Sequence, residues 1–460
     1  MRDTESGAPS APDISAFGYK QELKRSLSLL DLLTYGLVFI VPIAPVAVFG
    51  IVFNASHGMV PLVYLIGLGA MLFTALSYAS MAEAFPVAGS VYTYAARSLG
   101  PTIGFFSGWA ILLDYLLLPT LTYVVAAIAM HAAIPESPGS LWVVVMLAVV
   151  TCINCLGIEA TAKASFVLLA FQFGLLLLFA VLGGIALAHH VAGAHISLAP
   201  FYRPGAVSPA LVFGALSLAV LSFLGFDAVS TLSEESKGGS AAIGRATILS
   251  LCLSAVLFIA QTWLASIFMQ GRTSLAPGDP TNTAFYDVAA LIGGYGFKFL
   301  LAVPGVFLSG VAGAVTAQTA TARLLYGMAR DGKLPRALAF VDPHRKVPVR
   351  AVFLIAGITL CLALWLVDQL ELLTSMVSFG ALVGFLMLHI SVVAHFVWRK
   401  KSRNWLRHLV TPVIGFAITA TVLWNAETNA KVAGAAWMIA GGALFLSLKF
   451  LHRPGNWSGK

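Results

Sequence analysis

Charge is what this sequence has least of. Asp, Glu, Lys and Arg make up 10% of its 460 residues, against about 25% in an ordinary soluble domain. Apolar residues make up 59%, and the mean hydropathy is +0.90. A water-soluble chain of this length would need charged side chains to cover its surface. The composition therefore excludes a soluble enzyme, a disordered chain and a broad nucleic-acid-binding surface, and it indicates a protein that crosses a membrane many times.

Cysteine is also scarce, with four residues, which excludes a disulfide scaffold. Cys152 and Cys155 form a C-x-x-C pair, but no second pair or nearby histidine cluster completes a zinc set, so we expect plain buried thiols. Residues 327–333 match G-x-x-x-x-G-K, but Leu334 stands where a nucleotide-binding loop needs Ser or Thr. No nucleophile–base arrangement is visible either. We therefore expect no enzymatic activity, no metal and no cofactor.

The two ends of the chain differ from its middle. Residues 1–18 are rich in Ser, Pro and Gly and lack the apolar run of a signal peptide, so we expect a flexible cytoplasmic tail. Residues 452–460 form a second polar tail. No linker interrupts 19–451, which we expect to be a single domain.

Long apolar runs fill that domain. A helix needs about 20 apolar residues to cross the hydrocarbon core of a bilayer, and twelve runs approach or exceed this length. We predict an all-α integral membrane protein with twelve transmembrane helices. The runs are 29–54, 60–82, 101–130, 141–157, 163–187, 208–233, 246–269, 297–326, 350–367, 372–398, 409–425 and 432–450.

The basic residues are placed unevenly between these runs. With the N-terminus in the cytoplasm, about 23 of the 27 Lys and Arg residues fall on the cytoplasmic side, as the positive-inside rule requires. An even number of spans returns the C-terminus to the same side. This placement accounts for the net charge of +8 without a nucleic-acid partner.

Two of the runs contain helix-breaking residues. Pro42 and Pro45 lie inside the first run, and a proline removes an amide donor and clashes with a preceding carbonyl. In the sixth run, Gly225 lies beside Asp227 at a similar depth. Breaks in corresponding segments five spans apart are typical of inverted repeats that bind substrate near the midplane. The alternative is a proline kink in an otherwise continuous helix.

The repeat interpretation divides the domain further. Repeat one would cover about 29–187 and repeat two about 208–398. Helices 11 and 12, at about 409–450, would lie at the periphery or at a subunit contact. This division is inferred from the placement of the breaks, because the two halves show no obvious sequence identity.

Ionisable residues within the runs are the next candidates, since a charge inside a bilayer is costly and is usually functional. Asp227 lies at a predicted break, where it could pair with a substrate ammonium, hold a proton or cap the following half-helix. Asp114 lies in the third run and needs a partner in space, which could be substrate, an ion or a structural hydrogen bond. Glu234 and Glu235, at the end of the sixth run, are candidate gating charges. The candidate substrate-binding residues are Pro42, Ile43, Ala44, Asp114, Tyr115, Phe223, Gly225, Phe226 and Asp227.

With these residues in place, the chain resembles the amino acid–polyamine–organocation permeases and, among them, bacterial putrescine importers. The likeness runs from about residue 28 to 430 and is clearest in five stretches. These are 85–94 (FPVAGSVYTY), 104–115 (GFFSGWAILLDY), 223–235 (FLGFDAVSTLSEE), 322–332 (ARLLYGMARDG) and 379–385 (FGALVGF). The resemblance implies a LeuT-like fold of five plus five helices with helices 1 and 6 broken, a bacterial inner-membrane location and cation-coupled uptake by alternating access.

Three departures limit what the resemblance implies. Ala47 stands where putrescine importers carry an aspartate late in span 1, and Gln172 stands where some proton-coupled relatives carry a lysine. Gln172 is therefore a candidate coupling residue, and the coupling ion stays open between H⁺ and Na⁺. Span 1 also has Pro42 and Pro45 in place of the Gly-Ser-Gly run whose amides hold a substrate carboxylate in many amino-acid permeases. This favours an amine-bearing substrate.

The sequence thus predicts a secondary active transporter that imports a small amine or amino acid, with a polyamine such as putrescine favoured. An amino-acid permease or exchanger of the same fold is one alternative. An ion channel is an alternative of another class, although no carbonyl selectivity filter is visible. The expected partners are the substrate and membrane lipids, with no nucleic acid; a homo-oligomer stays open.

Overall fold

The computed structural model describes residues 14–133, 136, 138–205, 207–208, 216, 219–276, 279–366, 370–426 and 428–451. Within these ranges the regular structure is helical, and the single pairing outside helices is an isolated bridge between Leu27 and Ser236. Helices satisfy their own backbone hydrogen bonds, as a chain surrounded by lipid must. The all-α prediction is confirmed for the described residues.

Fifteen α-helices make up most of the described chain. In chain order they are α1 (Leu29–Ile40), α2 (Ala44–Ala55), α3 (Val60–Ala84), α4 (Ser90–Leu99), α5 (Pro101–Ala133), α6 (Gly139–Cys155), α7 (Ile158–Ala188), α9 (Gly239–Ile267), α10 (Asp279–Asn282), α11 (Ala284–Leu300), α12 (Val306–Arg330), α13 (Val349–Trp365), α14 (Leu370–Val392), α15 (Thr411–Trp424) and α16 (Thr428–Leu451). Short 3₁₀ segments are η1 (Ile14–Phe17), η2 (Val191–Gly193), η3 (Phe226–Glu235) and η5 (Arg336–Ala339). Three π-helical turns are η4 (Leu301–Gly305), η6 (Val393–Arg399) and η7 (Leu406–Val410).

Seven helical segments in the described part are long and apolar enough to cross a membrane, or eight when the bent pair α1–α2 counts as one span. Shorter apolar helices coincide with α6, α13 and most of α16. Most of the first half of the predicted run 208–233 lies outside the described residues. The count of twelve spans therefore stays a prediction.

The predicted run 297–326 lies within one apolar helical segment, Ala284–Arg330. In it the π-helical turn η4, which contains Pro304, joins α11 to α12. α4 was not expected, because a short helix with a mixed sequence gives no long apolar run. The buried-thiol expectation is right for Cys155, whereas Cys152 and Cys361 are exposed.

The break in the first span is confirmed. A capping box between Ser28 and Asp31 starts α1, which ends at Ile40. α2 begins at Ala44, and the two helices meet at 44°. Val41 adopts a left-handed φ of 60°, which is unusual for a β-branched residue. The span is therefore two helices joined by a strained connection, not one kinked helix.

The described part of the sixth predicted run is also interrupted near Gly225. A helical segment ends at Phe223, and the 3₁₀ helix η3 starts at Phe226. Gly225 between them has a φ of 116°, and a Cβ at this position would overlap the ring of Phe39. Glycine is thus required both by backbone conformation and by close approach. Because Phe39 comes from the end of α1, the two breaks meet directly.

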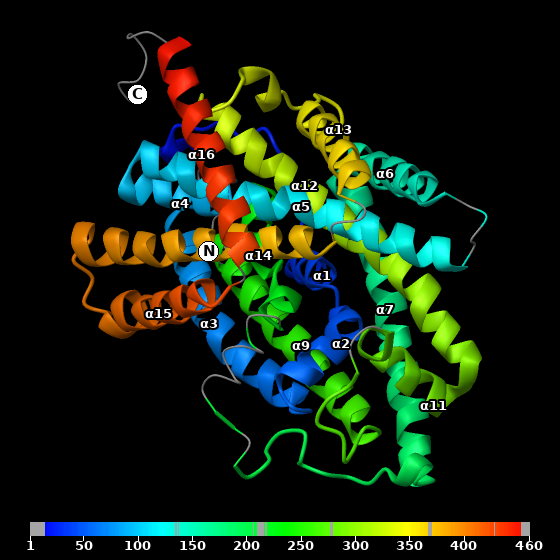
Figure 1. Cartoon of the computed structure of the whole chain (residues 1–460). Helices are drawn as coiled ribbons and strands as arrows, with labels where there is room; N and C mark the ends of the chain where they lie inside the picture. Colours follow the sequence, from blue (N-terminus) through cyan, green and yellow to red (C-terminus); the bar gives the residue numbers. More distant parts are fainter. Residues whose placement is uncertain are drawn as a thin grey trace, which may run out of the picture.

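The broken segments lie inside the bundle. α1 packs against α9, α7, α12 and η3, while α5 packs against α12, α14 and α4. Figure 1 shows α5 and α14 side by side across the molecule, with α15 at its outer edge. α16 is fixed to α5 by the stacked rings of Trp109 and Trp437, each of which donates its indole N–H to the other's carbonyl, at 2.8 and 2.7 Å.

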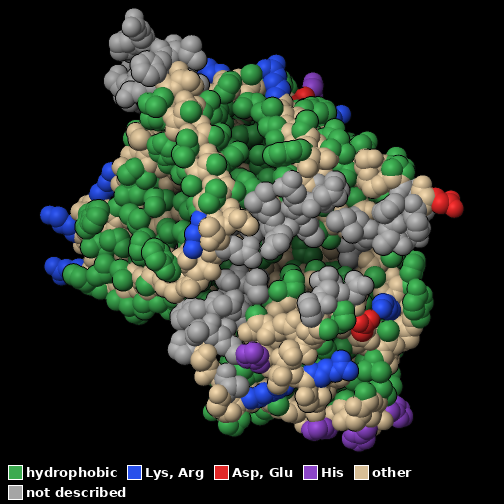
Figure 2. All heavy atoms as spheres, viewed as in Figure 1, with side chains coloured by type: hydrophobic (Ala, Val, Ile, Leu, Met, Phe, Trp, Pro, Cys, Tyr) green, Lys and Arg blue, Asp and Glu red, His purple; other side chains and the backbone are tan. Residues whose placement is uncertain are grey.

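The outer surface is apolar, as a surface in contact with lipid should be. α7 exposes large side chains such as Val167 and Leu177, each about two-thirds exposed. Figure 2 shows hydrophobic side chains over much of one face, with Lys and Arg gathered at the edge where α14 connects to α15. That connection contains Arg399, Lys400 and Lys401.

Candidate functional site

Asp227 is the central candidate, and the break in the sixth span holds it. It is the second residue of η3, directly after the left-handed Gly225 and Phe226, and it is fully buried. Its Oδ2 accepts hydrogen bonds from the hydroxyls of Tyr115 on α5 at 2.5 Å and Tyr78 on α3 at 3.4 Å. Its Oδ1 has no hydrogen-bond partner among the described residues. One carboxylate oxygen is thus positioned and the other is free.

Asp114, next to Tyr115 on α5, is also fully buried, and neither of its carboxylate oxygens has a partner in the described chain. Gly380 on α14 lets that helix approach here, because a Cβ at Gly380 would lie 2.8 Å from the Asp114 amide nitrogen. Asp114 directly precedes Tyr115, whose hydroxyl donates to Asp227. We call Asp114, Asp227, Tyr78 and Tyr115 the aspartate layer.

Aromatic rings surround this layer. The ring of Tyr78 packs edge-on against Phe226 and Phe385, with centroids 6.0 Å apart in both pairs. The ring of Tyr115 lies 6.0 Å from that of Phe39. Aromatic faces attract cations and accept apolar carbon chains. The layer therefore combines free carboxylate oxygens with surfaces that suit an organic cation.

No protein cation neutralises the aspartate layer in the described structure. The ion pairs found among the described residues all involve other acids. His389 on α14 is held by the hydroxyls of Ser77 and Thr74, at 3.0 and 3.3 Å. A buried carboxylate without a partner is costly. The layer can lower this cost by binding a cation or a proton.

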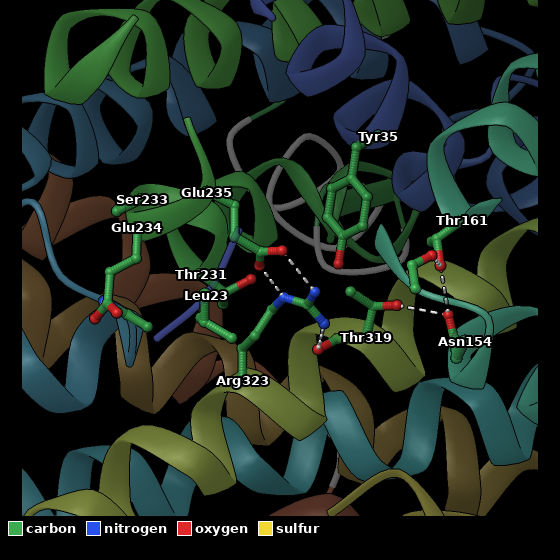
Figure 3. Close-up of polar contacts among 12 residues, drawn as sticks. Leu23, Tyr35, Asn154, Thr161, Thr231, Ser233, Glu234, Glu235, Thr319 and Arg323 are labelled. Carbon is green, nitrogen blue, oxygen red and sulfur yellow. Dashed lines mark hydrogen bonds and ion pairs between the residues drawn. The ribbon is translucent and has the colours of Figure 1, made fainter. Parts of the chain in front are cut away.

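Glu234 and Glu235, at the other end of η3, are placed very differently. Glu235 forms a two-pronged ion pair with Arg323 on α12, whose side chain is 3% exposed. Figure 3 shows the two side chains pointing toward each other, with Thr319 beside Arg323. Glu234 pairs with Arg330, through contacts of 2.7 and 3.0 Å, and accepts the amide of Ala88 at 2.9 Å.

We call these two acids and two arginines the ion-pair layer. Every carboxylate oxygen in it has a partner within the chain. η3 thus carries an unneutralised acid at its start and two neutralised acids at its end.

The N-terminal segment, residues 17–28, passes over the ion-pair layer. The amides of Ser26 and Leu27 donate to the Glu235 carbonyl at 3.1 and 3.0 Å. The ring of Tyr19 lies 3.9 Å from the Arg330 guanidinium, and its hydroxyl donates to Asp331 at 2.7 Å. Burial, and then the Asp331 charge, raise the pKa of Tyr19 from 10.0 to about 12, so it keeps its proton at neutral pH.

Gln172, the candidate coupling residue, lies on α7 and is fully buried, with no partner for either side-chain atom among the described residues. Leu169, one turn earlier, packs with Leu37 and Val38 of α1 and Ala312 of α12. On α6, Asn154 accepts a hydrogen bond from Thr319 at 2.7 Å, as Figure 3 shows, and donates one to Gln318 at 2.7 Å. Gln172 is not part of that network.

The structure brings some predicted site residues together and separates others. Asp114, Tyr115, Gly225, Phe226 and Asp227 gather at the aspartate layer. Phe223 instead packs with Tyr64 and Phe258, at ring distances of 5.8 and 5.3 Å.

The first break contributes fewer hydrogen-bond donors than expected. The amide of Ala44 donates to the Val41 carbonyl at 2.7 Å, and the Pro42 carbonyl accepts from Gln261 at 2.9 Å. The Ala44 amide is therefore already bonded within the chain in this structure. Ile43 lies in the break as expected.

Sequence reasoning missed Tyr78, Phe385 and the two arginines. Arg323 had a detectable signal, because it is a charged residue inside the apolar run 297–326 and so calls for a partner. Tyr78 had none, since an aromatic residue in an apolar run is ordinary.

Comparison with known proteins now decides the family. The profile described as amino acid permease matches residues 40–446. The chain belongs to the amino acid permease family. It is 32% identical over 432 residues to the low-affinity putrescine importer PlaP of Escherichia coli K12, covering 91% of this chain and 92% of that protein. The protein is therefore an integral inner-membrane permease and not an enzyme.

Two further relatives come from Bacillus subtilis. The branched-chain amino acid permease BcaP is 25% identical, with 87% of this chain and 86% of the relative covered. A methylthioribose transporter is 27% identical, with 89% and 90% covered. Since these relatives are named for three different kinds of compound, family membership alone does not give the substrate of this permease.

Proposed function

We propose that this permease is a secondary active transporter that imports a small amine or amino acid, with Asp227 binding the substrate ammonium. The observation that carries the proposal is a fully buried carboxylate, at the meeting point of two broken helices, with one oxygen positioned by tyrosines and the other unbonded. An ammonium group would supply both the missing hydrogen bond and the missing charge. The name of the putrescine importer relative agrees with an amine substrate.

Alternating access is the proposed mechanism. The twelve spans form two inverted repeats of five helices, about 29–187 and 208–398, within a single domain at 19–451, and helices 11 and 12 lie outside them. The N-terminal segment, the ion-pair layer and both termini face the cytoplasm. With the ion-pair layer closed, the aspartate layer would open toward the opposite side. Substrate binding would then favour rocking that separates α12 from η3 and releases the amine inward.

A cation gradient would drive this cycle, and no nucleotide is needed. Asp227 or Asp114 could carry a proton in this cycle. Gln172 on α7 is the candidate residue for coupling to sodium or protons, and it would act through the contact between α7 and α1. Uptake measured with an imposed pH gradient, and separately with an imposed sodium gradient, identifies the ion.

An amino-acid permease or exchanger of the same fold is the second candidate. The family profile and the branched-chain amino acid relative favour it. The two candidates differ in whether the site must also bind a substrate carboxylate. Counterflow with preloaded amino acids would support the second candidate, and uptake of amines without a carboxylate supports the first.

Radiolabelled uptake into proteoliposomes tests the role of Asp227. Asp227→Asn keeps the shape of the side chain but removes the charge, so we expect uptake to fall by at least about 100-fold. Asp287→Asn is the matched control, because Asp287 is an exposed acid paired with Lys298 elsewhere in the chain. Undiminished, gradient-driven uptake by Asp227→Asn would remove Asp227 from its proposed role.

A further inference from the structure

The connection between α14 and α15 carries a dense positive charge. We call residues 398–407 (WRKKSRNWLR) the basic turn. It contains no Asp or Glu, and its basic residues are Arg399, Lys400, Lys401, Arg403 and Arg407. Figure 2 shows Lys and Arg side chains projecting at this edge of the molecule, beside a largely hydrophobic face. The charge is therefore presented outward, next to the surface that lipid covers.

Two arginines tie the basic turn to neighbouring helices. The Arg399 guanidinium donates to the carbonyl of Arg97, in the last turn of α4, at 2.7 Å. Arg407 donates to Ser80 at 3.0 Å and to Glu83 at 2.7 Å, both in the last turns of α3. The turn is thus built against α3 and α4 and is not a free loop.

The backbone of the basic turn is held as well. The amides of Lys400 and Ser402 donate to the carbonyls of His395 and Phe396, at 3.0 and 2.8 Å. The ring of Phe396 stacks on that of His408, with centroids 4.0 Å apart. Because these contacts set the path of the chain, the basic side chains start from fixed positions.

Most of the positive charge has no counter-charge among the described residues. The ion pair between Arg407 and Glu83 is the one described ion pair that reaches the basic turn. The side chains of Lys400, Lys401 and Arg403 are exposed and lie outside those pairs. Like charges gathered in one turn repel each other unless anions lie beside them. The turn therefore favours anions from outside the chain.

Two tryptophans indicate where those anions lie. Trp398 is 69% exposed and Trp405 is 61% exposed, one on each side of the unpaired charges in the sequence. Leu406 beside them is also exposed. Indole rings are enriched where the hydrocarbon core of a bilayer meets the headgroups, because one part of the ring is apolar and the N–H is polar. Their exposure here indicates that the basic turn lies at the depth of the lipid phosphates.

We propose that the basic turn is a binding surface for anionic phospholipids. Lys400, Lys401 and Arg403 would pair with the lipid phosphates, while the two indoles lie against the glycerol and the upper part of the acyl chains. A zwitterionic lipid suits this surface less, because the same side chains repel its own positive headgroup. Since Arg399 and Arg407 fix the turn to α4 and α3, a bound lipid would also stabilise the packing of α14 and α15 on those helices.

Native mass spectrometry of the purified full-length permease measures the affinities of individual phospholipids. The wild type should bind phosphatidylglycerol at least about tenfold more tightly than phosphatidylcholine with the same acyl chains, since each basic side chain near a lipid surface attracts anionic headgroups. The variant K400Q/K401Q/R403Q removes the unpaired charges without touching the bonds to α3 and α4, so this preference should fall below about threefold.

The variant K163Q/R336Q/K346Q is the matched control. It removes the same charge from three exposed side chains that lie outside the basic turn and outside the described ion pairs. It should therefore keep the preference for phosphatidylglycerol. An equal loss in the two triple variants would overturn the inference, because the preference would then reflect net charge alone.

Fluorescence quenching locates the bound lipid. In proteoliposomes of phosphatidylcholine, a fixed fraction of acyl-brominated phosphatidylglycerol should quench tryptophan fluorescence more than the same fraction of brominated phosphatidylcholine. This excess should disappear in the variant Trp398→Phe with Trp405→Phe, and an excess that persists there would place the lipid elsewhere and overturn the inference.

Two further results would contradict the proposal. One is equal binding of both lipids by the wild type, which decides the matter even if K400Q/K401Q/R403Q does not fold. The other is displacement of phosphatidylglycerol by glycerol phosphate at equal concentration, because it would show that the turn binds a soluble phosphate and not a lipid.

Discussion

The two ends of η3 present the same chemical group in opposite situations. Glu234 and Glu235 are buried and fully paired with Arg330 and Arg323. Asp227, at the start of the same segment, is equally buried and keeps one oxygen unbonded, as does Asp114 with both oxygens. Burial alone therefore does not distinguish a structural acid from a binding acid. The difference lies in whether the chain itself supplies the counter-charge.

This difference also suggests how the two layers work together. Arginines of the chain neutralise the acids of the ion-pair layer, whereas the acids of the aspartate layer have no such partner among the described residues. Because η3 belongs to both layers, a cation bound at Asp227 acts on the element that carries Glu234 and Glu235.

Disrupting the ion-pair layer should lower the free energy of unfolding more than any other change considered. Arg323→Ala leaves Glu235 buried without its partner, which should cost about 3–5 kcal/mol of unfolding free energy. Thermal unfolding in detergent measures the change. The double variant Arg323→Met with Glu235→Gln removes the uncompensated charge and should recover much of the loss. An Arg323→Ala variant as stable as the wild type would show that the ion pair does not stabilise the bundle.

The meeting of the two breaks should be the next most sensitive point. Gly225→Ala forces a side chain into a left-handed conformation and against the ring of Phe39, which should cost about 1–3 kcal/mol. In a Phe39→Ala background the overlap with the ring is absent but the backbone strain remains, so Gly225→Ala should cost less there than in the wild type, as a double-mutant cycle of melting temperatures would show. Gly174→Ala is the control, because a Cβ at Gly174 meets nothing within 4 Å.

The positioning of Asp227 should depend on one tyrosine more than on the other. Tyr115→Phe removes a 2.5 Å hydrogen bond to the carboxylate, and Tyr78→Phe removes one of 3.4 Å. A hydrogen bond to a charged group contributes about 1.5–3 kcal/mol, so Tyr115→Phe should change amine affinity by at least tenfold. The longer bond of Tyr78 should matter less. Equal effects of the two variants would contradict this ranking.

The N-terminal segment should have the smallest effect. Tyr19→Phe keeps the ring against Arg330 but loses the hydrogen bond to Asp331, and Tyr19→Ala loses both. We expect about 0.5–1 kcal/mol for the ring contact, seen as faster labelling of a cysteine placed near the ion-pair layer. Because the Tyr19 pKa is raised to about 12, this difference should stay constant between pH 6 and pH 9. A difference that changes within that window would mean that Tyr19 does not stay protonated.

Much of the fold was accessible from the sequence because its determinants are local. Pro42 and Gly225 mark the two breaks by their own backbone chemistry, and apolar runs mark the spans. α4 and the joining of α11 to α12 were missed, since hydropathy does not detect a short mixed helix or a π-helical turn.

The candidate site was accessible only in part. Asp114 and Asp227 stand out as acids in apolar runs, whereas their relation depends on how α5 packs against η3. Arg323 and Glu235 are 88 residues apart, so their pairing requires the tertiary structure.

An experimental structure of the permease with putrescine bound tests the central claim most directly. The account predicts an amine nitrogen within hydrogen-bonding distance of Asp227 Oδ1, the carbon chain against Phe226 and Phe385, and the Glu234–Arg330 and Glu235–Arg323 pairs intact when the opposite side is open. Putrescine bound away from η3, with Asp227 still holding an unbonded oxygen, would contradict it.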